Sequence, residues 1–332
     1  MGGLSSINCF LNREGIMKII IGFILLGQFC FYPLNLFSQI NQSNIIITYV
    51  TSWGEQGAGR LQFNEPNGIS VSPEGNIYIA DTGNQRIQKL NRQGEFIKEV
   101  GGYGWGQEEF DQPVSLDAAN GLDVYVADYN NHRIERYDKD LNYLASFFTS
   151  DDIPGDLQLG YPLDVNISNQ GEIFCLDGDN IRILKLNIQG EPQLSFADFD
   201  AGEGRLYKPG KMCIVASKSL YVSDLEKQVI MGFDIYGNYM NTIGAGILQA
   251  PYGIANLDSD YLMVTDYDQK VVFIFNITGQ LITQIDRNKY TGQTFNTPVD
   301  VCSYQNKIFV LDKTACRIDI FHINFNKGQS EE

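Results

Sequence analysis

The residues best suited to chemistry in this chain are aspartates that recur at nearly regular spacing. Six of them end short apolar segments, 42 to 49 residues apart: Asp81, Asp128, Asp177, Asp224, Asp266 and Asp312. Four are followed five residues later by an arginine: Arg86, Arg133, Arg182 and Arg317. A carboxylate beside a guanidinium could serve acid–base chemistry, but a catalytic site is needed once and not six times. Because an aspartate after a strand can accept hydrogen bonds from turn amides, we interpret both sets as structural.

A second polar set lies two positions after a recurring proline. The prolines are Pro66, Pro113, Pro162, Pro209, Pro251 and Pro298. The residues at this offset are Gly68, Ser115, Asp164, Lys211, Gly253 and Asp300. Alternate residues of a strand share one face, and this position differs between units. If the six segments surround a channel, Ser115, Asp164, Lys211 and Asp300 form a ligand-binding site at its mouth; the alternative is a water-filled pore.

Few other residues suggest metal or covalent chemistry. Asp164 and Asp300 are the only candidate metal ligands, for a divalent cation in the channel, and no other cofactor is predicted. The two histidines, His132 and His322, are too few for a zinc site built from several histidines. His132 stays open as a catalytic base. No paired-cysteine zinc motif, phosphate-binding glycine loop or serine elbow is apparent.

Secondary-structure elements must hold these candidate site residues in place, and the repeat predicts that these elements are β-strands. In the first unit, four short runs with period-2 alternation follow Pro66 and end near Val100, separated by Gly, Asn and Pro clusters. That pattern predicts an antiparallel meander. One such sheet cannot bury both faces, whereas sheets stacked radially can. The sequence therefore predicts an all-β protein, a six-bladed β-propeller of four-stranded antiparallel sheets.

The start of the repeat region supplies a means of closing the ring. The sixth unit lacks a fourth strand, and residues 45–50 form an apolar run without a unit of their own. We expect this N-terminal strand to complete the last blade, with the propeller spanning residues 44–323 and a polar tail at 324–332. An apolar residue shortly before each proline is expected to fill the seam between blades: Phe63, Phe110, Leu159, Leu206, Leu248 and Phe295.

The N-terminal segment predicts the cellular localisation of the protein. Residues 1–38 contain a short basic start, an apolar stretch and a small residue, which is typical of a signal peptide, with Met17 as an alternative start. We expect a secreted or periplasmic protein of the cell envelope. The alternative is an uncleaved membrane anchor. Outside this segment four cysteines favour free thiols over a disulfide, with one bridge left open: Cys175, Cys213, Cys302 and Cys316.

The charge balance argues against nucleic-acid partners. The chain of 332 residues carries 40 acidic and 24 basic residues, a formal net charge of −16. Such a surface repels phosphate backbones, and no Lys/Arg cluster offsets it. We therefore expect no nucleic acid, and a membrane contact only through an uncleaved N-terminal segment.

The first two units also resemble a known repeat. Residues 66–71 and 75–87, with residues 124–128 and 131–134 of the second unit, are similar to the NHL repeat. The third unit keeps the pattern, whereas Val229 and Val271 replace the arginine in the fourth and fifth units. The resemblance implies a propeller of a secreted, bacterial type and leaves its function open.

From these features we expect a monomeric binding scaffold for protein, peptide or glycan partners. Rigid blades that carry varied loops favour recognition, so we lean against an enzyme. The alternative is a propeller enzyme of the lactonase, lyase or hydrolase type, with a polar or metal site in the axial channel.

Overall fold

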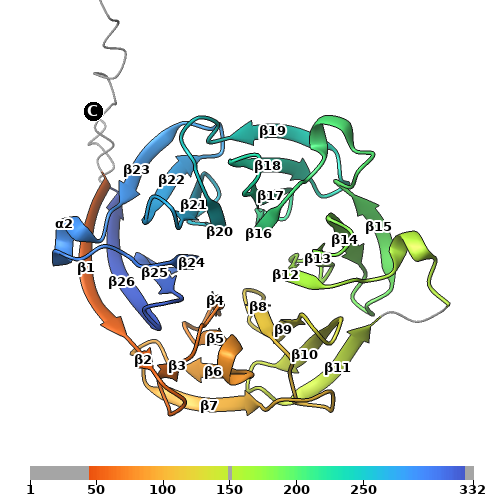
Figure 1. Cartoon of the computed structure of the whole chain (residues 1–332), viewed down its shortest axis with the longest axis horizontal. Helices are drawn as coiled ribbons and strands as arrows, with labels where there is room; N and C mark the ends of the chain where they lie inside the picture. The colour runs from red at the N-terminus through yellow and green to blue at the C-terminus, as the bar shows by residue number, and fades with distance from the viewer. Residues whose placement is uncertain (1–44, 149–151, 326–332) are drawn as a thin grey trace, which may run out of the picture. The chain divides into compact units, whose positions relative to one another are not determined.

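Six four-stranded antiparallel sheets surround one axis in a computed structural model that describes residues 45–148 and 152–325 (Figure 1). The leader 1–38 and most of the tail 324–332 lie outside these residues. No helix within the described ranges is long and apolar enough to cross a membrane. The predicted six-bladed β-propeller is confirmed.

Each blade is a meander whose first strand lies nearest the axis. The innermost strands are β4 (Gly68–Val71), β8 (Pro113–Asp117), β12 (Pro162–Ile167), β16 (Pro209–Val215), β20 (Pro251–Asn256) and β24 (Pro298–Tyr304). The second strands are β5 (Ile77–Asp81), β9 (Asp123–Asp128), β13 (Ile173–Asp177), β17 (Ser219–Asp224), β21 (Tyr261–Asp266) and β25 (Lys307–Asp312).

The outer half of each blade follows the same order. The third strands are β6 (Arg86–Leu90), β10 (Arg133–Asp138), β14 (Arg182–Leu186), β18 (Val229–Asp234), β22 (Val271–Asn276) and β26 (Arg317–Phe325). The fourth strands are β7 (Phe96–Gly101), β11 (Tyr143–Phe148), β15 (Pro192–Phe196), β19 (Tyr239–Ile243), β23 (Leu281–Ile285) and, for blade 6, β1 (Ile45–Trp53).

Strand β1 closes the ring, as the orphan run predicts. It pairs antiparallel with β26 from Ile45 opposite Phe325 to Trp53 opposite Ile318, with a bulge between Tyr49 and Thr51. β26 extends to Phe325, two residues beyond the expected end of the propeller. A closed ring leaves no exposed radial edge between the first and last blades.

Short elements occupy the segments between strands. These are the parallel pair β2 (Glu55–Gln56) and β3 (Gln62–Phe63), the 3-10 turns η2 (Thr82–Asn84), η3 (Gly155–Leu157) and η4 (Gly202–Gly204), and the helix α2 (Asn288–Thr291). The sequence pattern predicts no sustained helix, and α2 is a single turn between blades 5 and 6.

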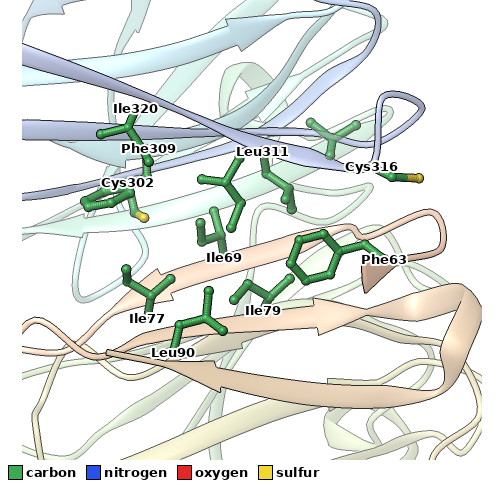
Figure 2. Close-up of a cluster of buried hydrophobic side chains, with 12 residues drawn as sticks. Phe63, Ile69, Ile77, Ile79, Leu90, Cys302, Phe309, Leu311, Cys316 and Ile320 are labelled. Carbon is green, nitrogen blue, oxygen red and sulfur yellow. The ribbon is translucent and has the colours of Figure 1, made fainter. Parts of the chain in front are cut away.

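The hydrophobic core consists of seams between neighbouring blades. In one seam, shown in Figure 2, Ile79 of blade 1 faces Leu311 of blade 6, and Phe63 from the connector packs at the end of both. Phe63 is fully buried, as are the equivalent Phe110 and Phe295. Burying both faces of each sheet explains why apolar residues occur at successive positions in the second strands.

The ring has two distinct faces. We call the connector face the side that carries the inter-blade segments, such as 54–67 and 102–112, and the turns between second and third strands. Backbone hydrogen bonds join these segments in every blade, for example Gly83 N to Asn64 O at 2.8 Å. The opposite side, the hairpin face, carries the turns between first and second strands and between third and fourth strands.

Candidate functional site in the axial channel

The polar residues two positions after the prolines come together at the axis. The inner strands pair only with the second strands of their own blades, so their other edges face the channel. Ser115, Asp164, Lys211 and Asp300 are all at most 6% exposed. They come from blades 2, 3, 4 and 6, and together we call them the Lys211 layer.

Lys211 links the layer across the channel. Its Nζ donates to Asp300 Oδ2 at 2.8 Å and lies 3.4 Å from Ser115 Oγ, so one side chain of blade 4 reaches blades 2 and 6. Ser115 Oγ in turn donates to Asp164 Oδ1. The result is one connected hydrogen-bond network through four blades, of the kind that makes buried polar groups tolerable.

The two carboxylates also bind the next blade's inner strand. Asp164 Oδ2 accepts a hydrogen bond from the backbone N–H of Met212 at 2.7 Å, and Asp300 Oδ2 accepts one from the backbone N–H of Ile69 at 2.9 Å. Both amides lie three positions after a repeat proline on an otherwise unpaired strand edge. A buried amide needs an acceptor, so each aspartate stabilises the junction to the next blade.

Close packing explains the two glycines of the series. A Cβ at Gly253 would lie 2.5 Å from Val299 O and 2.6 Å from Asp300 Cα, and one at Gly68 would lie 2.9 Å from Ser115 Cα. Inner strands of adjacent blades therefore approach too closely for a side chain at these positions. Part of the variation between units at this position, from which we predicted a ligand-binding site, therefore reflects this packing.

Burial and charge set the protonation of the layer. Burial raises the pKa of Asp164 to about 6, against the opposing effects of Lys211 and Ser115. Burial also raises the pKa of Asp300, although Lys211 opposes it. For Lys211, burial lowers the pKa but Asp300 and Asp164 raise it by more, so it stays protonated. A protonated lysine is not a base for Ser115, and the arrangement does not activate a nucleophile.

The layer forms the floor of a cavity of about 490 Å³ that opens on the hairpin face. Rim residues such as Asn169, Ser217 and Asp258 belong to the turns between first and second strands. On the connector side of the layer, Asn67 Nδ2 lies 3.5 Å from the Tyr252 hydroxyl. The predicted site residues therefore meet inside the channel, at the closed end of a cavity, and not at a mouth beside the prolines.

The two candidate metal ligands already have hydrogen-bond partners. Across residues 45–148 and 152–325, no three His, Cys, Asp or Glu side chains gather in one place. Asp300 is paired with an ammonium and Asp164 with a hydroxyl. His132 lies elsewhere, with its ring 3.9 Å from that of Tyr161, and His322 lies on β26 opposite Thr48.

The repeated Asp and Arg form a clamp on the connector face. Asp81 accepts Arg86 Nε at 2.8 Å and the Asn64 amide at 2.7 Å. The Arg86 guanidinium also donates to Ala58 O, Gly59 O and Gln62 O of the preceding connector. Asp128 with Arg133 and Asp177 with Arg182 repeat this arrangement. The clamp fixes the connector backbone by satisfying its carbonyl groups.

Blades 4 to 6 build the clamp differently. Three positions after the aspartate, Lys227 Nζ donates to Arg205 O at 2.6 Å and Gln269 Nε2 donates to Ile247 O at 2.8 Å. Asp224 and Asp266 still accept connector amides at 2.7 Å. In blade 6, Arg317 pairs with Asp312 at 3.4 Å and with Asp319 at 2.9 Å.

Sequence reasoning missed buried charges in the third strands. Glu135 and Asp319 lie two positions after an arginine and are fully buried, beside Arg133 and Arg317 respectively. Burial raises the pKa of Glu135 to about 7. For Asp319 the available signal was a carboxylate between the apolar residues Ile318 and Ile320 of its strand, whereas β10 also carries other charged residues and gave no such signal. The four cysteines of the described region are free and buried, and Cys213 and Cys302 line the cavity.

Comparison with known proteins agrees with this architecture. The NHL repeat family matches residues 63–90 and 110–137. The B-box type zinc finger protein ncl-1 of Caenorhabditis elegans is 42% identical over 59 residues, and Protein brain tumor of Drosophila melanogaster is 39% identical over 64 residues. These stretches cover 18% and 19% of this chain, but only 7% and 6% of those proteins.

Solved structures share the fold. Virginiamycin B lyase from Staphylococcus aureus aligns over 84% of this chain and 98% of its own, with a TM-score of 0.56 and 14% identity. A Bacteroides thetaiotaomicron protein of unknown function aligns over 84% and 76%, with a TM-score of 0.63 and 13% identity. The fold defines a six-bladed β-propeller. Its first two blades contain the stretches that match the NHL repeat.

Proposed function

We propose that this propeller is a secreted or periplasmic binding scaffold that recognises a protein partner through its connector face. The observation that carries the proposal is an aromatic side chain held outward on a fixed backbone. Trp105 is 69% exposed, yet its carbonyl accepts Arg133 Nη1 at 2.9 Å. Rigid, exposed aromatic residues contribute large contact area at little cost in conformational entropy.

The same connector presents a second aromatic side chain on a similarly fixed segment. The Tyr103 side chain is exposed, while its backbone pairs with that of Phe110 in an isolated parallel β-bridge. Arg133 Nη2 donates to Glu109 O at 2.6 Å, so both ends of the segment are clamped. Such a segment resembles a recognition loop on a rigid support more than a hinge.

A further aromatic patch lies on the connector between blades 3 and 4. Phe199 is 73% exposed, and the Arg205 guanidinium stacks 4.2 Å from its ring centroid and 4.5 Å from that of Tyr207. Lys227 holds this connector through Arg205 O. An arginine stacked between aromatic rings on a clamped loop is typical of interface residues.

Charge favours a basic partner surface. The chain has a net charge of −16, and electrostatic complementarity raises association rates. We therefore propose that the partner is a protein. The experiment below would also reveal binding of a peptide or a glycan instead. Within the described channel, Lys211 is paired with Asp300 and therefore does not serve as a base for the enzyme alternative.

The test compares matched variants on the two faces. The purified chain is immobilised and exposed to proteins from the source's own cell envelope and culture medium. We expect a protein whose capture is lost in Trp105→Ala and retained in Tyr236→Ala, since Tyr236 is 71% exposed on the hairpin face. Capture of equal strength by both variants, or protease-resistant capture of a polysaccharide, would contradict the proposal.

A further inference from the structure

The channel cavity has two chemically different walls beyond the Lys211 layer. They are formed by the residues four positions after the repeat prolines, roughly 7 Å further along each inner strand. Blades 1 to 3 contribute Ser70, Asp117 and Asn166, and blades 4 to 6 contribute Cys213, Ala255 and Cys302. One arc is therefore polar, and the facing arc consists of a methyl group and two thiols, which pack as small apolar groups.

Asp117 is the unusual member of the polar arc. It is 8% exposed, and its oxygens accept the Ala119 amide at 2.7 Å and the Ile167 amide at 2.8 Å. Throughout the described part of the chain, no Lys, Arg or His forms an ion pair with it. Burial raises its pKa, and the two amides only partly offset that effect. Buried carboxylates are ordinarily accompanied by a cation.

Ser70 and Asn166 line the same cavity as Asp117 and carry side-chain oxygens. Asn166 donates its Nδ2 to Val165 O at 2.7 Å, which leaves its Oδ1 with no donor from the described residues. Ser70 Oγ accepts the Ala118 amide at 3.1 Å. The cavity lining holds four aspartates, Asp117, Asp164, Asp258 and Asp300, against Lys211 as the one cationic lining residue.

We propose that this cavity binds a small primary amine that carries a hydrocarbon group. The ammonium donates to Asp117 and to Asn166 Oδ1, and the hydrocarbon packs against Cys213, Ala255 and Cys302. A cation beside Asp117 supplies the charge partner that the protein does not provide and favours the ionised carboxylate. The volume falls within the range of small-molecule sites, about 300–1,000 Å³. This site is on the hairpin face and does not depend on the proposed partner at the connector face.

Three matched probes test the proposal by calorimetric titration of the full chain: phenethylamine, 2-phenylethanol and phenylacetate. They share a phenyl ring and differ in whether the polar end is a cation, neutral or an anion. We expect the amine to bind about tenfold or more tightly than the alcohol, and phenylacetate not to bind. Equal binding of amine and alcohol by the unmodified protein overturns the proposal.

Two substitutions locate the site. Asp117→Asn should weaken phenethylamine binding about tenfold or more, whereas Asp268→Asn, which removes the same charge from an exposed turn on the connector face, should leave it unchanged. If Asp117→Asn does not fold, Ala255→Leu narrows the opposite wall without altering the carboxylate and should also weaken binding. Undiminished amine binding in a folded variant of either residue overturns the assignment.

Discussion

Lys211 of blade 4 donates to Asp300 of blade 6 at 2.8 Å, across a channel in which both side chains are almost fully buried. The bond joins inner strands 89 residues apart in sequence. It ties alternate blades together at the axis and closes the channel cavity on one side. The layer is thus a structural tie and also the floor of a candidate binding site.

Removing this lysine should destabilise the ring. Lys211→Met leaves Asp300 buried without its cation, which costs about 3–5 kcal/mol in the free energy of unfolding. Urea titration of the purified protein measures the change. Lys289→Met, on the exposed turn α2, removes the same charge and should change stability by less than about 0.5 kcal/mol. A similar, small effect of both substitutions would contradict the role given to the pair.

The raised pKa of Asp164 predicts a particular pH dependence. The folded protein protonates this carboxyl at about pH 6, whereas the unfolded chain does so near the ordinary value of 3.8. Between these values the folded state binds the extra proton, so the contribution of Asp164 to stability increases as pH falls through 6 and is complete below 3.8. Above pH 6 that contribution is lost.

Asp164→Asn removes this titration. Unfolding free energies measured by urea titration at intervals from pH 4 to pH 7.5 should show a smaller decline toward high pH in the variant than in the unmodified chain. The slope of unfolding free energy against pH reports the titration of Asp164, whereas a constant offset between the two curves reports the effect of the substitution on stability. Parallel curves for the two proteins would show that Asp164 does not titrate in this range.

The clamp on the connector face makes a prediction about two arginines of one strand. Arg133→Ala leaves Asp128 and Glu135 buried without their cation and should cost about 3–5 kcal/mol. Arg136 pairs with Asp123 nearer the surface, at 2.7 Å, so Arg136→Ala should cost less than about 1 kcal/mol.

Amide hydrogen exchange distinguishes a local effect from a global one. In Arg133→Ala the amides of Gly104 and Phe110, which bond within the connector, should exchange faster relative to the strand amides of the same blade. Arg136→Ala should leave this ratio unchanged. Unaltered connector protection in Arg133→Ala would mean that the guanidinium does not hold the segment.

The leader yields a prediction that concerns residues outside the described structure. If residues 1–38 are a signal peptide, expression of the full chain in a secreting host should release a product that begins at Gln39. N-terminal sequencing or intact mass measures the start. A membrane-bound product that retains residues 17–38 would support the anchor instead.

The sequence predicted the blades because local signals specify them. Period-2 alternation and turn residues mark each strand, and the missing fourth strand of the sixth unit pointed to residues 45–50. The same signals place Ser115, Asp164, Lys211 and Asp300 at one level of the channel. These signals do not indicate how far a long side chain extends, so the hydrogen bond from Lys211 to Asp300 could not be predicted from the sequence.

Other features depend on three-dimensional packing. The direction in which the cavity opens follows from which turns line it, such as those that carry Asn169, Ser217 and Asp258, and the spacing of the repeat does not reveal this. Lys227 and Gln269 take over connector contacts made elsewhere by arginines, from a position three residues after the aspartate and not five. Aligning the repeats position by position does not detect such a change, because the same contact is made by a residue at a different position.

Both proposals require six blades to face one axis, which in turn requires β1 to pair with β26. Thr48 lies opposite His322, so Thr48→Cys with His322→Cys should form a disulfide and stabilise the protein by about 3–5 kcal/mol, because the closed loop is long. Thr48→Cys with Lys307→Cys is the matched control. Lys307 lies opposite His322 on β25, two strand spacings or roughly 9.6 Å from Thr48, too far for a disulfide. Peptide mapping under non-reducing conditions should find the cross-link in the first variant alone; its absence there, or its presence in the control, would contradict the closed ring.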